Sequence, residues 1–235
     1  MEDVRSIDSL FLQDAINAKK WAFATDYLRV YILYYYGGIY MDLDVYVYRS
    51  LEPFLVHEAF SGIEFWPRLY VSTINKKTVK GIGIDAAIMG AVKGHKWIGD
   101  ILFHYSNMRF KLRPKEYMKI VMPNVIGKIS IDSYGFIPVP IFQVLKDDVY
   151  LYPPDVFSAV YKNSISRVDS TEEAYKRYGE YDNIRYSCHL CANSWGYQVK
   201  QSKLQKIIFV VKKVIIFIVG KDRIAKLKSN KKSKW

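Results

Sequence analysis

Apolar residues recur every three to four positions over residues 9–36, and this spacing predicts a helical segment in one or two pieces. Gly37 and Gly38 follow as a natural helix stop. Two short runs rich in apolar and β-branched residues come next, at 39–41 and 45–48, and such runs are typical of strands. The pattern in the first quarter of the chain therefore predicts a helix, then a glycine turn, then strands.

The rest of the chain alternates between strand and helix patterns. Further strands are expected at 59–65, 70–74 and 149–152, a buried element at 81–90, helices at 97–108 and 121–131, and a polar helix or loop at 170–178. This alternation predicts an α/β layered domain. Because the last clear globular pattern ends near residue 197, we expect one domain over 1–199 and a separate segment over 200–235.

Charge divides the chain at the same place. The 235 residues are 50% hydrophobic, which excludes a mainly disordered protein, and their net charge is +12. Residues 200–235 hold 12 of the 35 Lys and Arg and one of the 23 Asp and Glu, so they carry +11 and residues 1–199 carry +1. A basic protein is a candidate for binding nucleic acid, but the nearly neutral body shows no nucleic-acid-binding motif, so we expect no nucleic acid partner.

The basic segment also has an apolar face. Residues 204, 207, 208, 211, 215 and 218 are apolar with helical spacing and are flanked by lysines. This pattern predicts that residues 203–235 form an amphipathic helix on an anionic membrane surface; the alternative is a solubilising tail that packs partly on the body. With no signal peptide and no apolar stretch long enough to span a bilayer, we expect a cytoplasmic protein, peripheral on the cytosolic face of the membrane. Cys188 and Cys191 are then expected to be thiols.

Two pairs of charged residues form the strongest candidate site. On a strand, Asp42 and Asp44 point to the same side with their Cα atoms about 7 Å apart. Converging carboxylates repel unless a cation lies between them, and Mg²⁺ or Mn²⁺ would suit their oxygens; the alternative is two solvated acids at a strand end. On the preceding helix, Asp26 and Arg29 are three residues apart and share a face. They are either a surface ion pair or a fork that holds sugar hydroxyls or phosphate.

These residues lie in a longer pattern that resembles a known family. The sequence ATDYLR from Ala24 to Arg29, followed by GGIY and DLDV up to Val45, resembles the sugar-binding DXD region of glycosyltransferase family 32. The resemblance continues more weakly at three places: the segment 85–91 with Gly94 and His95, the segment 150–157, and His189 with Ser194 and Trp195. Members of the family include bacterial polysaccharide-assembly transferases and fungal mannosyltransferases.

The resemblance implies a type-A glycosyltransferase fold, with a mixed central sheet flanked by helices. It implies a retaining transfer of a sugar from a nucleotide-sugar donor to a saccharide or lipid-linked acceptor, as in capsular polysaccharide synthesis, with Mn²⁺ or Mg²⁺ on the diphosphate. The implied metal ligands are Asp42 and Asp44, and the implied catalytic residues are Asp42, Asp44 and Asp85. The implied substrate-binding residues are Asp26, Arg29, Gly38, Tyr40, His189, Ser194 and Trp195.

In one respect the chain departs from the family pattern. It starts just before the helix over 9–36, whereas family members usually carry a first strand and part of the nucleotide pocket upstream. We therefore expect the catalytic domain to be short at its amino terminus, with an open sheet edge and weak donor binding. The alternative function is that of an inactive, truncated relative that serves as a membrane- or partner-binding module.

Overall fold

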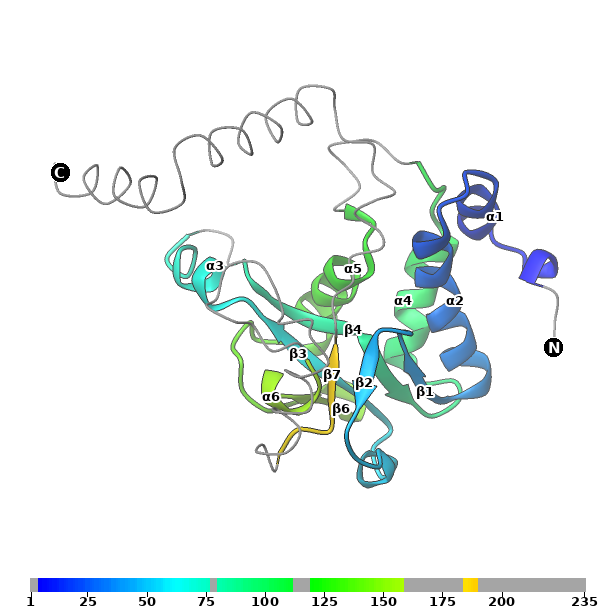
Figure 1. The fold of residues 1–235 in the computed structure, drawn as a ribbon. Helices are drawn as coiled ribbons and strands as arrows, with labels where there is room; N and C mark the ends of the chain where they lie inside the picture. The colour runs from blue at the N-terminus through cyan, green and yellow to red at the C-terminus, as the bar shows by residue number, and fades with distance from the viewer. Residues whose placement is uncertain (1–3, 77–79, 112–118, 159–183, 190–235) are drawn as a thin grey trace, which may run out of the picture. The chain divides into compact units, whose positions relative to one another are not determined.

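The computed structural model describes residues 4–76, 80–111, 119–158 and 184–189 (Figure 1). All of them belong to the first of the two compact units into which the chain divides, residues 1–196. The expected helix or loop at 170–178 and the basic segment 203–235 lie outside the described residues, so the structure does not test either prediction.

The amino-terminal helical segment forms in two pieces. Helix α1 (Leu10–Asn17) begins at Ser9, whose side chain accepts a hydrogen bond from the Leu12 N–H. Helix α2 (Trp21–Tyr36) follows after a break at which Lys19 has a φ of 55°. It ends at Gly37, whose φ of 71° and ψ of −169° lie in a region that side chains with a Cβ rarely occupy. The predicted helical segment and its glycine stop are confirmed, and of the two alternatives the structure shows two pieces.

A five-stranded sheet lies at the centre of the unit, in the order β1-β4-β3-β6-β5. Its strands are β1 (Gly38–Met41), β3 (Ala59–Phe65), β4 (Ile82–Ala91), β5 (Gln143–Leu145) and β6 (Val149–Tyr152). The β3–β6 pair is parallel and the other pairs are antiparallel, so β1, β3 and β6 all run in one direction. A second, two-stranded antiparallel sheet joins β2 (Val45–Val47) to β7 (Ser187–His189).

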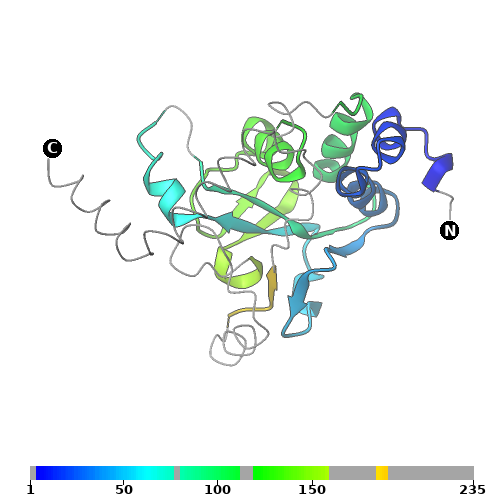
Figure 2. The ribbon, with the colours of Figure 1, turned by 45° about the horizontal axis from the view of Figure 1, so that its top comes forward.

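The central sheet separates two layers, as Figure 2 shows. On one face lie α1, α2, α4 (Lys96–Ser106) and α5 (Met122–Ile129), packed over a core that includes Phe11, Trp97 and Ile126. On the other face lie α6 (Pro154–Phe157) and the two-stranded sheet, around an aromatic cluster that includes Phe54, Phe60 and Phe157. This arrangement confirms the predicted α/β architecture with a mixed central sheet flanked by helices.

The remaining elements are short, and one of them corrects a prediction. They are η1 (Val4–Ser6), η2 (Glu52–Phe54), α3 (Pro67–Val71), η4 (Ser130–Tyr134) and η5 (Lys146–Asp148). The strand expected at 70–74 is wrong, because α3 begins at Pro67, which suits the first position of a helix, and turns follow it. The hydroxyls of Ser72 and Thr73 donate to the Leu69 carbonyl and hold these turns. No helix among the described residues is both long enough and apolar enough to cross a bilayer.

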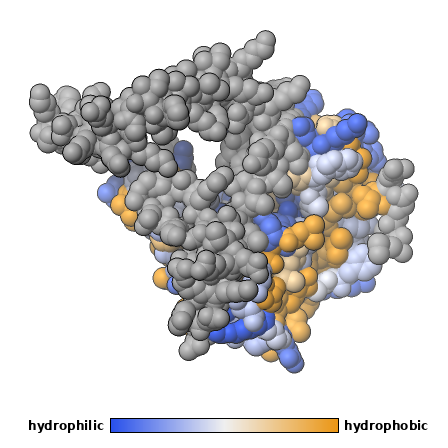
Figure 3. All heavy atoms as spheres, in the orientation of Figure 1, coloured by the Kyte–Doolittle hydropathy of each residue, from blue (hydrophilic) through white to orange (hydrophobic). Residues whose placement is uncertain are grey.

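Exposed apolar side chains gather beside β1 and β2. Figure 3 shows hydrophobic atoms on this side of the molecule, where the described exposed residues include Met41, Leu43, Val47, Leu55 and Val56. Leu43, which separates Asp42 from Asp44, is fully exposed. The loop that carries the two aspartates therefore lies at the surface of the unit.

Candidate active site

The candidate site lies where β1, the edge strand of the central sheet, ends. Backbone hydrogen bonds hold the loop that follows this strand: the Asp42 N–H donates to the Ala87 carbonyl on β4 (2.8 Å), and the Val45 N–H donates back to the Asp42 carbonyl (3.1 Å). The aspartate pair is thus fixed to the central sheet on one side and continues directly into β2 on the other.

The two-stranded sheet brings a histidine to this loop. His189 on β7 pairs with Val45 on β2, the residue next to Asp44. Its Nε2 atom lies 3.6 Å from Asp44 Oδ1. One ligand atom each from Asp42, Asp44 and His189 lies within 4.8 Å of the other two, and all three residues are half-buried. Two carboxylates and an imidazole at such spacing fit a divalent cation.

A third aspartate lies on the other side of His189. Asp85 on β4 is 2% exposed, and its Oδ1 accepts the Ala87 N–H (2.9 Å) and lies 3.6 Å from His189 Nδ1. Burial alone would raise the pKa of Asp85, but the hydrogen bonding and charge of His189, together with the Ala87 N–H, outweigh it and hold that pKa below its usual value. Asp85 is therefore ionised at neutral pH.

A buried arginine connects α2 to the aspartate loop. Arg29 is 6% exposed; its Nη2 lies 3.0 Å from Asp26 Oδ1, and its Nη1 lies 3.3 Å from Asp42 Oδ1. The Nη1 atom also donates to the Ala86 carbonyl on β4, at 2.5 Å. The predicted pairing of Asp26 with Arg29 thus exists, but it is a buried pair, not a surface one, and it reaches the DXD loop.

Asp26 and the neighbouring Tyr40 both have raised pKa values. Burial raises the pKa of Asp26 to about 6, because loss of solvation outweighs the attraction of Arg29 and the hydrogen bond from the Met122 N–H. Burial also raises the pKa of Tyr40, whose hydroxyl donates to Asp42 Oδ1 at 2.6 Å and whose ring lies 4.7 Å below the Arg29 guanidinium. At pH 7 the site therefore holds an ionised Asp26 and a neutral Tyr40.

Two buried polar atoms at the site have no hydrogen-bond partner among the described residues: Arg29 Nε, a donor, and Asp85 Oδ2, an acceptor. Native proteins rarely leave such groups unsatisfied. Both atoms are closed off from solvent, so a ligand reaches them only if neighbouring groups move.

The structure brings together most of the site residues expected from the sequence: Asp26, Arg29, Tyr40, Asp42, Asp44, Asp85 and His189. Gly38 lies at the opposite end of β1, roughly 13 Å from Asp42 by strand rise, so it does not join this cluster. Ser194 and Trp195 lie outside the described residues. Whether these residues act in binding and catalysis as the resemblance implies stays a prediction.

His189 is the residue whose position the sequence described least well. The resemblance predicted that it lies near the donor, but not that it shares a candidate cation site with Asp42 and Asp44. The signal that places it there is the pairing of β2 with β7, and a three-residue strand has almost no sequence signature of its own.

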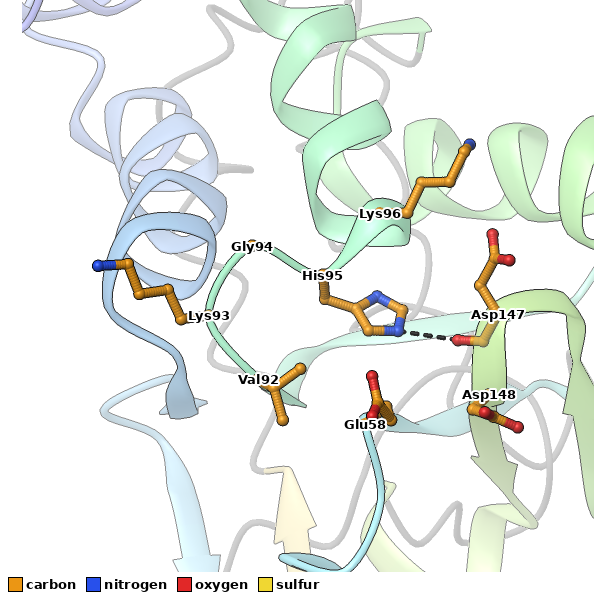
Figure 4. A pocket seen from close by; sticks show the side chains of 8 residues that line it. All are labelled: Glu58, Val92, Lys93, Gly94, His95, Lys96, Asp147 and Asp148. Carbon is orange, nitrogen blue, oxygen red and sulfur yellow. Dashed lines mark hydrogen bonds between the residues drawn. The ribbon is translucent and has the colours of Figure 1, made fainter.

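A hollow lies at the opposite end of the central strands, near the starts of β3 and β6. It has a volume of about 340 Å³ and is lined by Glu58, Val92, Lys93, Gly94, His95, Lys96, Asp147 and Asp148 (Figure 4). His95 is buried here; its Nδ1 accepts the Trp97 N–H at the start of α4, and its Nε2 lies 2.8 Å from the Asp147 carbonyl. Both ring nitrogens have structural partners, so His95 joins α4 to the loop before β6.

Comparisons with known proteins match part of the chain. Residues 1–61 match the model of the glycosyltransferase sugar-binding region containing the DXD motif. Over 85 residues the chain is 34% identical to inositol phosphoceramide mannosyltransferase 3 of Schizosaccharomyces pombe. That alignment covers 36% of this chain and 20% of the relative, so the chain matches only about a fifth of the relative's length.

Proposed function

We propose that the chain, which is similar to glycosyltransferases of the family 32 type that carry a DXD sugar-binding region, transfers a sugar from a nucleotide-sugar donor to a saccharide or lipid-linked acceptor. The observation that supports this most is the convergence of Asp42, Asp44 and His189 next to the buried pair of Asp26 and Arg29. A cation site beside the Asp26–Arg29 ion pair suits a ligand that has both a diphosphate and a sugar.

The proposed cofactor is Mn²⁺ or Mg²⁺, held by Asp42, Asp44 and His189. When bound, such an ion neutralises the negative charge that develops on a departing nucleoside diphosphate. The protein contributes three fixed ligands from two sheets: the loop after β1 supplies the carboxylates and β7 supplies the imidazole.

The sugar of the donor is proposed to contact Asp26 and Arg29. An ionised carboxylate accepts hydrogen bonds from hydroxyl groups and a guanidinium donates them, and both side chains are held in place by burial and by each other. Ser194 and Trp195 are proposed, on the resemblance alone, to contact the diphosphate.

We further propose that the transfer retains the configuration of the anomeric carbon. This proposal and that of a lipid-linked or capsular polysaccharide acceptor rest on the resemblance and on the relative, whose name describes a mannosyltransferase acting on inositol phosphoceramide, a lipid. NMR of the first product formed tests the stereochemistry, because an α-linked donor must then give an α-linked product.

Hydrolysis of a panel of UDP- and GDP-sugars tests the proposed function. With Mn²⁺ we expect turnover of at least one donor by the wild type and loss of that turnover in Asp44→Asn. Asp148→Asn is the matched control, because it makes the same chemical change outside the cluster and keeps a residue type that tolerates the φ of 51° found there. If no donor in the panel is bound or hydrolysed by the wild type, the inactive-relative alternative holds.

The basic segment is proposed to bring the protein to the cytosolic face of an anionic membrane. The support is the concentration of 12 basic residues and one acidic residue in 200–235, together with the apolar face over 203–235. Flotation with phosphatidylserine-containing vesicles is expected to recover the full chain but not a chain without residues 203–235. Equal recovery of both, or equal recovery with neutral vesicles, contradicts the proposal.

A further inference from the structure

We propose that Asp85 is a positioning residue: its carboxylate fixes the ring of His189 so that Nδ1–H points to Asp85 and the Nε2 lone pair faces Asp42 and Asp44. This inference rests on the proposed function, since it concerns how the chain prepares His189 to hold the cation. It assigns Asp85 a role that acts through His189, in addition to the direct catalytic role that the sequence implied.

Asp85 is held rigidly by the central sheet. Its Oδ1 accepts the Ala87 N–H at 2.9 Å, and its backbone carbonyl accepts the hydroxyl of the fully buried Ser61 at 2.7 Å. Both ends of the residue are therefore tied to the β3–β4 pair. A carboxylate anchored in this way can impose an orientation on a neighbour without being displaced by it.

His189 lies between two carboxylates, one at each ring nitrogen. Asp85 Oδ1 is 3.6 Å from Nδ1, and Asp44 Oδ1 is 3.6 Å from Nε2. The two acids differ in their surroundings, because the side chain of Asp85 is 3% exposed and that of Asp44 is 27% exposed. Asp85 is thus the fixed partner and Asp44 the one with access to solvent and to a cation.

Charge supports the same assignment. Within the described part of the chain, His189 is the one side chain able to carry a positive charge that lies within ion-pair distance of Asp85. A buried carboxylate is costly unless donors surround it, so Asp85 favours the imidazole tautomer that presents N–H to it. That tautomer leaves Nε2 as an acceptor, which is the form that binds a metal ion.

Ala87 and His189 both face Oδ1 of Asp85. The Ser158 side chain also acts on this carboxyl and helps to lower its pKa. Because Asp85 has partners besides His189, a test of the positioning role must report on His189 and not on turnover alone.

A Mn²⁺ titration followed by electron paramagnetic resonance tests the inference in a double-mutant cycle of Asp85→Asn and His189→Ala, each in the full chain. The asparagine keeps the shape of the side chain and an Oδ1 acceptor for Ala87. We expect Asp85→Asn to weaken Mn²⁺ binding about 10- to 100-fold in the wild-type background and to have no further effect in His189→Ala. An unchanged affinity in Asp85→Asn, or an equal loss in both backgrounds, overturns the positioning role.

The same titration separates this inference from the proposed function. If the wild type binds Mn²⁺ and Asp85→Asn binds it equally well, only the positioning role fails. If the wild type binds no Mn²⁺ at all, the proposed cation site fails, and the inference fails with it.

A second readout needs no variant of Asp85. In the Mg²⁺-loaded chain with ¹⁵N-labelled histidine, NMR correlation spectra at pH 8 are expected to show the His189 proton on Nδ1. A proton on Nε2 contradicts the inference even if Asp85→Asn cannot be purified. His189→Ala identifies the signal among those of His57, His95 and His104.

Discussion

Arg29 determines the electrostatics of the site at the scale of single residues. Three acceptors surround its guanidinium: the carboxylates of Asp26 and Asp42 and the carbonyl of Ala86. Two negative charges around one positive charge leave the group with a net negative charge before any ligand binds. A divalent cation at Asp42 and Asp44 would offset that charge, which explains why acids gather here in a body whose overall charge is nearly neutral.

The raised pKa of Asp26 makes stability depend on pH in a defined direction. The pKa of Asp26 is about 6 in the folded protein, whereas its ordinary value, which applies to the unfolded chain, is 3.8. Between pH 6 and pH 4 the folded state therefore binds a proton that the unfolded chain does not bind. Acidification through this window therefore stabilises the folded state at this residue. From pH 7 to pH 5 the free energy of unfolding of the wild type is expected to rise by about 1 kcal/mol relative to Asp26→Asn.

Urea unfolding of both proteins at several pH values measures this difference. The variant serves as its own control for all other titrating groups, because only Asp26 is removed. A stability difference that does not change between pH 7 and pH 5, or that changes in the opposite direction, contradicts the assignment.

At the scale of elements, patterns within one segment were informative and pairings between distant segments were not. The period of α2, the glycines after it and the strand-forming runs of β3 and β6 act locally, so the sequence predicted these elements at nearly their observed bounds. The strand expected at 70–74 failed because Pro67 and the side-chain hydrogen bonds of Ser72 and Thr73 favour a helix and turns.

The residues of the candidate site also differ in whether a local pattern could predict their positions. Asp26 with Arg29, and Asp42 with Asp44, could be predicted because each pair follows the period of one helix or one strand. The positions of His189 and Asp85 around the loop could not, because they depend on the β2–β7 pairing and on the register of β4. The sequence pointed to these two residues only through the resemblance.

The junction of α2 and β1 depends on a glycine. At Gly37 the backbone has φ 71° and ψ −169°, and a Cβ there would lie 2.8 Å from the Lys93 nitrogen. Gly37→Ala is therefore expected to lower the free energy of unfolding by about 1–3 kcal/mol from backbone strain alone, and more from the clash. Chemical denaturation measures this loss.

Gly127→Ala is the matched control for that substitution. Gly127 lies inside α5, where an added Cβ meets no atom within 4 Å, so alanine is expected to stabilise the helix by up to about 1 kcal/mol. Equal effects of the two substitutions are inconsistent with the strain assigned to Gly37.

For the molecule as a whole, the candidate cation site connects the two sheets. Asp42 follows β1 of the central sheet, and His189 belongs to β7 of the small sheet, so a bound ion adds a link between the sheets to the Asp85–His189 ion pair that already joins them. A ligand that binds only the folded state must then stabilise the entire unit. The net charge of the chain belongs to another part of it, because most of the excess of basic residues lies outside the unit that carries the candidate site.

Thermal unfolding with and without Mn²⁺ measures this link. At an ion concentration about 100 times the dissociation constant, the wild type is expected to gain about 2.7 kcal/mol, which raises its Tm by roughly 5–11 °C. Asp44→Asn is expected to show little or no rise, and Asp148→Asn the full rise. A similar rise in all three proteins would mean that the ion stabilises the protein from another site.

Asp42, Asp44 and His189 are proposed to form the metal site of a glycosyltransferase. Anomalous diffraction from crystals grown with Mn²⁺ and a nucleotide sugar tests this proposal most directly. We expect one strong manganese peak between these three side chains, in contact with the diphosphate, with the sugar next to Asp26 and Arg29. A manganese peak elsewhere, or a bound nucleotide sugar with no metal at these three residues, would contradict the account.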